Sequence, residues 1–159
     1  EGLKLCFIGD GNNMANSLIV GGLKCGMDVS VACPEGYDPD QKVLDFAKTV
    51  KDSKFQLCRT PEEAAVDADV MITDVWASMG QEGEKAAREK AFAGFQVNDA
   101  LMSLAHEGCM VQHCLPAHRG EEITAEVFEA HAGEIFDEAE NRLHAQKAVM
   151  FLLVGGEHA

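Results

Sequence analysis

The segment HCLPAHRGEE, residues 113–122, places a thiol, imidazole groups and a guanidinium group close together in the sequence. Cys114 follows an apolar run and lies two residues before Pro116, a placement typical of the loop after a strand. A thiol in such a loop could hold or accept a proton, and a neighbouring cation would lower its pKa. The alternative is a buried structural cysteine, because free cysteine is among the most buried residue types. Cys114 alone is compatible with both roles.

The segment GDGNNM, residues 9–14, matches a dinucleotide-binding loop only in part. Met14 stands where such a loop has its third glycine, and the next predicted strand ends at residues 32–33 without an acid for the ribose. The sequence therefore disfavours NAD binding. The amide of Asn13 can both donate and accept, so it could bind a substrate carboxylate. The alternative for Asn12 and Asn13 is a role in a turn or a helix cap.

The segment DVWASMG, residues 74–80, follows another apolar run. The carboxylate of Asp74 could pair with an ammonium group, and Ser78 and the backbone of Met79 offer further polar contacts. The alternative is that Asp74 caps a helix and Trp76 fills the core.

Basic side chains that could bind an anion occur in two places. His118 and Arg119 belong to the first segment, and Arg142 lies near the start of the last predicted helix. A guanidinium fork suits phosphate or a carbamoyl oxygen. The alternatives are solvated surface charges for His118 and Arg119, and an i,i+4 surface pair with Glu138 for Arg142.

Apolar runs with strand character alternate with helix-like patterns along the chain. We expect strands in LKLCFIGDGNN, which ends in a turn, and in DVSVAC, FQLCRT, DVMITDV and CMVQHCL, the last at residues 109–115. Helices are expected in MANSLIVGGLKCG, QKVLDFAKTVKD and PEEAAVDA, over residues 84–106 with a break near GFQVN, and over about 137–154.

This alternation predicts an α/β fold, a Rossmann-like, doubly wound and mostly parallel sheet of five strands with helices on both faces. In such sheets, ligands bind beyond the carboxyl ends of the strands. The loops after the first, fourth and fifth predicted strands hold Asn13, Asp74 and Cys114. We therefore expect these three side chains to meet at one site.

The composition excludes several classes of protein. The 159 residues are enough for one folded unit, and the 27 acidic against 13 basic residues give a net charge of −14, which disfavours nucleic acid and anionic membranes. Neither a membrane-spanning run nor a secretion signal is evident, so we expect a cytoplasmic protein. The six cysteines form no CxxC pair, and most are expected to be buried free thiols.

Five segments in this order resemble the ornithine carbamoyltransferases, specifically their C-terminal, ornithine-binding half. They are GDGNNMANS, TDVWASMGQE, FQVN, HCLPAHRGEEI and FDEAENRLHAQKAVM, and the resemblance covers essentially the whole chain. It implies transfer of the carbamoyl group of carbamoyl phosphate to the δ-amine of L-ornithine, giving L-citrulline and phosphate, without a metal or organic cofactor.

The resemblance also implies roles for individual residues. Matching positions assign Asn13, Asp74, Ser78 and Met79 to the α-amino and α-carboxylate groups of ornithine, Cys114 with Leu115 to the reacting amine and carbamoyl group, and Arg142 to carbamoyl phosphate. Cys114 is the candidate catalytic residue, because the δ-amine has a pKa of about 10 and must lose a proton before it attacks.

The family's enzymes also have an N-terminal half with an STRT-type phosphate loop and an HPxQ-type motif, and neither string occurs here. We therefore expect residues 1–159 to be the ornithine-binding domain of a two-domain enzyme, inactive alone and trimeric when full length. Two alternatives remain open: a non-catalytic module that binds an amino acid, and a transcarbamoylase for another amine such as putrescine.

Overall fold

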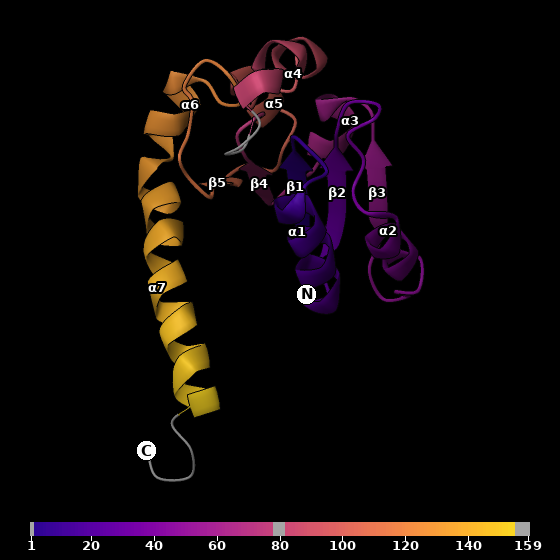
Figure 1. The fold of residues 1–159 in the computed structure, drawn as a ribbon, viewed down its shortest axis with the longest axis vertical. Helices are drawn as coiled ribbons and strands as arrows, with labels where there is room; N and C mark the ends of the chain where they lie inside the picture. Colours follow the sequence, from indigo (N-terminus) through magenta and orange to yellow (C-terminus); the bar gives the residue numbers. More distant parts are fainter. Residues whose placement is uncertain (1, 78–81, 155–159) are drawn as a thin grey trace.

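Five parallel strands form the centre of the computed structural model, which describes residues 2–77 and 82–154 (Figure 1). They are β1 (Lys4–Ile8), β2 (Asp28–Ala32), β3 (Phe55–Cys58), β4 (Val70–Thr73) and β5 (Met110–His113). Their order in the sheet is β3-β2-β1-β4-β5, and every pairing is parallel. The predicted five-stranded α/β sheet is confirmed, and it is wholly rather than mostly parallel.

Helices connect the strands and follow the last one. They are α1 (Asn13–Lys24), α2 (Gln41–Ala47), α3 (Pro61–Ala65), the 3-10 helix η1 (Glu82–Glu84), α4 (Lys85–Ala91), α5 (Asp99–Met102), α6 (Ala125–Ala130) and α7 (Ala132–Val154). Polar side chains fix several starting points: the Asn12 side chain accepts from the backbone of Met14, and the Thr124 side chain accepts from Val127.

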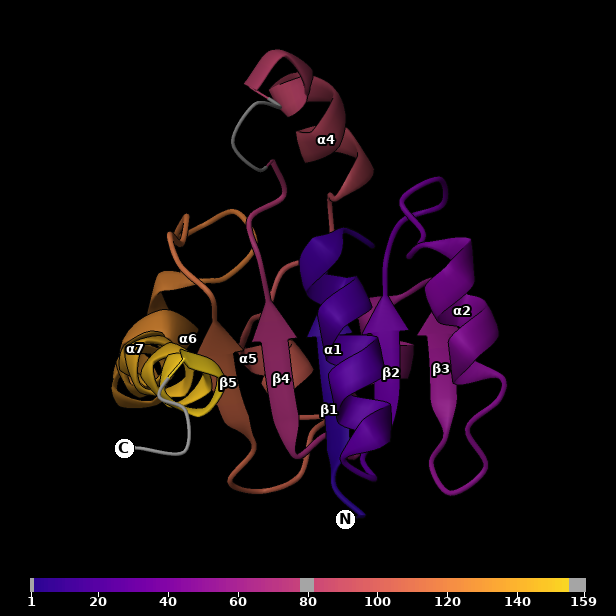
Figure 2. The ribbon, with the colours of Figure 1, turned by 60° about the horizontal axis from the view of Figure 1, so that its bottom comes forward.

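The two faces of the sheet are covered by different helices, as predicted. On β1, Leu5 and Phe7 point to the face that packs against α1 and α2, whereas Cys6 and Ile8 point to the face covered by α3, α5 and α6. Figure 2 shows α1 and α2 in front of the strands, with α4 and the loop after β5 beyond the carboxyl ends of the strands.

Several predicted boundaries were wrong. The second helix ends at Ala47, not near residue 52, and the third ends at Ala65, not at residue 68. The fifth strand ends at His113, not at residue 115, because the backbone turns at Leu115, which has a φ of 53°. The last helix begins at Ala132, not near residue 137. It is preceded by α6, which was not predicted and which ends at Ala130 with His131 as its C-cap, so two helices meet there at a break. Sequence periodicity does not reveal such a break, because both sides of it are helical.

Helix α7 extends well beyond the rest of the fold (Figure 1). Its residues from 139 to 154 are all exposed, including Phe151, Leu152 and Leu153 at 61%, 78% and 80%. Within residues 2–77 and 82–154, no helix combines the length and apolar character that crossing a bilayer requires.

Candidate active site

A pocket of about 650 Å³ opens at the carboxyl ends of β1, β4 and β5. Five of the residues selected from the sequence line it: Asn13, Asp74, Cys114, Leu115 and Arg142. The chain leaves β1 toward one face of the sheet and β4 toward the other, so the pocket lies where doubly wound sheets bind ligands. The two remaining predicted residues, Ser78 and Met79, lie outside the described residues.

Strand register brings Asp74 and Cys114 together. Thr73 of β4 pairs with His113 of β5, so the next residue of each strand lies at the same level of the sheet. The Cys114 thiol donates to Oδ1 of Asp74 across 3.1 Å. The same Oδ1 accepts from the backbone of Val75 at 2.8 Å, and the Asn12 amide donates to Oδ2 at 3.3 Å. Asp74 is a buried carboxylate held by three neutral donors, which leaves its negative charge for a cationic ligand.

The two asparagines of the first loop make different contacts. Asn12 caps α1 and contacts Asp74, so the helix-cap interpretation is correct for it. Asn13 is the first residue of α1 and lines the pocket, where its amide is available to a ligand. Gly11 precedes the two asparagines and lies against the backbone of Asp38. A Cβ atom at position 11 would lie 2.3 Å from the carbonyl carbon of Asp38, so only glycine fits there.

The surroundings of Cys114 hold it as a neutral thiol. Burial is the largest cause that raises its pKa, to about 12, followed by the hydrogen bond and the charge of Asp74. The possibility that a neighbouring cation lowers this pKa is not realised, because burial and the Asp74 carboxylate raise it. The side chain is only half-buried, so the sulfur faces the pocket while its proton is directed to Asp74.

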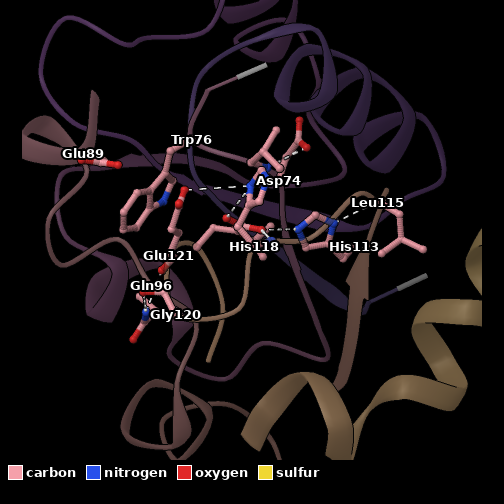
Figure 3. A network of polar contacts seen from close by, with 12 residues as sticks. Asp74, Trp76, Glu89, Gln96, His113, Leu115, His118, Gly120 and Glu121 are labelled. Atoms are coloured by element: carbon pink, nitrogen blue, oxygen red, sulfur yellow. Dashed lines mark hydrogen bonds and ion pairs between the residues drawn. The ribbon is translucent and has the colours of Figure 1, made fainter. Parts of the chain in front are cut away.

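A buried histidine–glutamate pair shapes the loop that carries Cys114. His113 and Glu122 are both fully buried, and Nε2 of His113 lies 3.0 Å from Oε1 of Glu122. The backbone N–H of Leu115 donates to Nδ1 of His113 at 2.9 Å (Figure 3). The imidazole proton therefore lies on Nε2 and is donated to Glu122. Glu122 also accepts from the backbone of His118 at 2.6 Å. The pair thus ties both ends of the loop 114–118.

Sequence reasoning missed this pair, although a signal was present. Val111 and His113 of β5 alternate inward, and Cys109 just before the strand is buried in the same way. A histidine on a buried face requires a polar partner, and Glu122 lies close enough in the sequence to supply one.

Basic groups also line the pocket. Arg142 lines it from α7 and is exposed, and the described residues show no ion pair between it and Glu138, contrary to the surface-pair alternative. Lys85 also lines the pocket, and its ammonium lies 3.0 Å from Glu121. Arg119, in contrast, pairs with Glu129 at 2.7 Å on the surface, as its alternative interpretation proposed.

One group of side chains has the composition of a metal site. Possible ligand atoms of His118, Glu121 and Glu122 lie within 4.8 Å of one another. Oε2 of Glu122 is enclosed and lacks a hydrogen-bond partner among the described residues, while Lys85 already brings a positive charge to Glu121. The Lys85 ammonium group therefore neutralises part of the negative charge of these three side chains.

A buried ion pair connects the first loop to α4. Nη1 of Arg88 lies 2.7 Å from Asp10 and donates to the carbonyl of Trp76 at 2.9 Å. Trp76 is 9% exposed and stacks with Phe92, so the core-filling interpretation is correct for it. Nothing in the local sequence pattern indicated the Asp10–Arg88 pair, because its partners are 78 residues apart.

Comparison with known proteins identifies the family. Residues 1–153 match the family described as "Aspartate/ornithine carbamoyltransferase, Asp/Orn binding domain". An ornithine carbamoyltransferase of Geobacter metallireducens is 54% identical over 154 residues, covering 97% of this chain and 51% of the relative. One from Pyrococcus abyssi is 53% identical over 159 residues, covering 98% of this chain and 50% of the relative.

Solved structures agree. The ornithine carbamoyltransferase of Pyrococcus furiosus superposes with a TM-score of 0.91 at 52% identity, covering 98% of this chain and 51% of that one. The anabolic enzyme of Campylobacter jejuni gives a TM-score of 0.91 at 42% identity, covering 95% and 51%. The chain thus spans about half the length of the relatives it matches, and it belongs to the aspartate/ornithine carbamoyltransferase family.

Proposed function

We propose that the chain is the ornithine-binding half of an ornithine carbamoyltransferase, which transfers the carbamoyl group of carbamoyl phosphate to the δ-amine of L-ornithine. The observation that carries the proposal is the contact of Cys114 with Asp74 in a pocket that Asn13 and Arg142 also line. The names of the similar proteins support ornithine as the substrate. The proposal includes an amino-terminal half that binds carbamoyl phosphate, a trimeric whole enzyme and a cytoplasmic location.

The polar groups of the pocket suit an amino acid with a second amine. Asp74 pairs with the α-ammonium group, and the amide of Asn13 donates to the α-carboxylate, with Ser78 and Met79 assigned to the same head group by the resemblance. The side chain of ornithine then extends past the sulfur of Cys114 toward Leu115. Arg142 approaches carbamoyl phosphate from α7.

The reaction requires the δ-ammonium to lose two protons while one C–N bond forms. The nitrogen lone pair attacks the carbonyl carbon, the C–O bond to phosphate breaks, and one proton leaves with the phosphate while the other reaches solvent. Cys114 is neutral and donates to Asp74, so its sulfur can accept a hydrogen bond from the attacking amine and orient its lone pair.

Positioning supplies most of the rate enhancement in this scheme. Holding two substrates in register can contribute on the order of 7 kcal/mol or more, whereas a proton-handling group typically contributes about 10²- to 10⁴-fold. We therefore expect Cys114→Ala to lower kcat of the two-domain enzyme within that range without abolishing turnover.

Calorimetry with L-ornithine tests the binding half directly. The chain should bind L-ornithine and norvaline but not putrescine, which lacks the head group, and Asp74→Ala should abolish the heat. Asp45→Ala, which removes an exposed carboxylate of α2 that does not line this pocket, should preserve it. Equal binding of putrescine and ornithine would contradict the proposal.

Addition of an amino-terminal half tests turnover. The chain alone should make no citrulline, and the two halves together should make it. Ornithine binding without any turnover in the reassembled enzyme would instead support the non-catalytic amino-acid-binding module.

A further inference from the structure

The outer edge of β5 is covered by two glutamates of α7. β5 is the last strand of the sheet, so alternate backbone N–H groups along it point away from β4. The N–H of Val111 donates to Oε2 of Glu134 at 2.8 Å, and the N–H of His113 donates to Oε2 of Glu138 at 2.9 Å. Two helix carboxylates thus take the place of a sixth strand.

These contacts are concentrated in a short part of the helix. Figure 2 shows α7 beside β5 and seen almost end-on, so the helix crosses the edge of the sheet instead of following it. Ile135 is the one fully buried side chain that α7 contributes among the described residues, and it lies between the two glutamates. The first two turns therefore hold the helix in place.

Arg142 lies one helical turn beyond the last of these contacts. Side chains four residues apart share a helix face, so Arg142 follows Glu138 on the side of α7 that contacts β5. Every residue from 139 to 154 is exposed. Arg142 nevertheless lines the same pocket as Leu115.

We propose that Glu138, assisted by Glu134, is a positioning residue: its hydrogen bond to the backbone of His113 sets where α7 crosses β5, and thereby places Arg142 at the pocket. This inference rests on the proposed function, in which Arg142 contacts carbamoyl phosphate. The same bond connects α7, which carries Arg142, to the end of β5, where His113 immediately precedes Cys114.

The test compares Glu138→Ala, which removes the acceptor, with Glu138→Gln, whose amide oxygen can still accept from His113. Glu140→Ala is the matched control, since Glu140 is exposed on the same helix and pairs with His144. In the chain itself, amide hydrogen exchange of His113 should accelerate about tenfold or more in Glu138→Ala, because a hydrogen bond to a charged acceptor is lost. Glu138→Gln should stay close to the native rate, and Glu140→Ala should match it.

Kinetics of the chain joined to an amino-terminal half show whether this contact positions Arg142. Glu138→Ala should raise KM for carbamoyl phosphate about tenfold and leave KM for ornithine within about twofold, and Glu138→Gln should restore most of the loss. A general loss of structure would raise both constants together. Circular dichroism of Glu138→Ala verifies that the helix persists.

The failures of the inference and of the proposed function are distinguishable. An unchanged exchange rate of His113 in Glu138→Ala overturns the inference, whatever the enzyme does. Faster exchange with an unchanged KM for carbamoyl phosphate also overturns it, provided that Arg142→Ala raises that KM. If Arg142→Ala itself has no effect, the proposed role of Arg142 is wrong, and the inference falls with it.

Discussion

The thiol of Cys114 should react slowly with disulfide reagents because it stays protonated. Its pKa of about 12, against an ordinary 9.0, reduces the thiolate fraction at pH 8 from about 10% to about 0.01%. The reaction uses the thiolate, so this factor of about a thousand slows it. A thiolate of higher pKa is also a better nucleophile, which recovers about 16- to 32-fold at a Brønsted coefficient of about 0.4–0.5. The net expectation is a rate about 30- to 60-fold below that of an ordinary thiol with equal access.

Asp74→Asn should remove much of this protection. The hydrogen bond and the charge of Asp74 are the second and third causes of the raised pKa, after burial. The substitution keeps the size of the side chain and removes the charge, so modification of Cys114 should accelerate at least several-fold, with the figure of about 30- to 60-fold as its upper bound. Glu121→Gln removes a charge from the same pocket without a contact to Cys114 and should leave the rate unchanged.

Peptide mass spectrometry after timed exposure to a small disulfide reagent measures the rate at each cysteine. Cys25 is exposed and serves as an internal reference for reagent activity. Saturating ornithine should protect Cys114 further by covering the pocket. Native Cys114 reacting as fast as Cys25, or an unchanged rate in a folded Asp74→Asn variant, would refute the assignment of a proton held between sulfur and carboxylate.

Three further predictions concern stability and association. Burial raises the pKa of Glu138 above its ordinary 4.5, so its charge destabilises the folded chain at neutral pH. This destabilisation disappears as the pH falls toward 4.5 and the carboxylate is protonated. In urea titrations, Glu138→Gln should therefore stabilise the chain at neutral pH and lose that advantage toward pH 4.5. His113→Ala should cost about 3 kcal/mol of unfolding free energy, because it leaves the buried Glu122 without its imidazole donor, and adding Glu122→Gln should recover part of the loss. The exposed apolar end of α7 should cause self-association that rises with concentration in light scattering; Leu152→Glu should reduce it and Leu104→Glu, at 38% exposure elsewhere, should not.

The sequence predicted the fold well because the fold depends on local pattern. Each strand is an apolar run bounded by turn residues, and the alternation of strands with helices restricts the chain to a parallel sheet. The same reasoning placed Asn13, Asp74 and Cys114 at one edge, since the carboxyl ends of parallel strands meet there. It did not reveal that Asn12 contacts Asp74, because one residue's difference in the loop decides which amide turns inward.

Local sequence patterns did not predict the contacts between residues that are distant in the sequence. The thiol–carboxylate contact joins residues 40 positions apart, and the sequence left open whether the neighbour of Cys114 would be a cation. The same limit applies to Glu138, for which an i,i+4 partner on its own helix was considered but whose actual partner is the backbone of His113. Helical periodicity predicts neighbours within a helix, whereas only the packing of α7 on β5 determines what lies across from it.

The register between β4 and β5 determines both the position of Cys114 and the burial of His113. Thr73 opposite His113 places Asp74 opposite Cys114, and a slip of one residue would move the thiol away from the carboxylate and turn His113 out of the core. Two independent sets of contacts oppose such a slip: Glu122 holds the His113 ring from within, and Glu134 and Glu138 hold the outer backbone of β5. The register is thus fixed by glutamates on both sides of one strand, and a variant that loosens either side should disturb the Asp74–Cys114 contact before it disturbs the sheet.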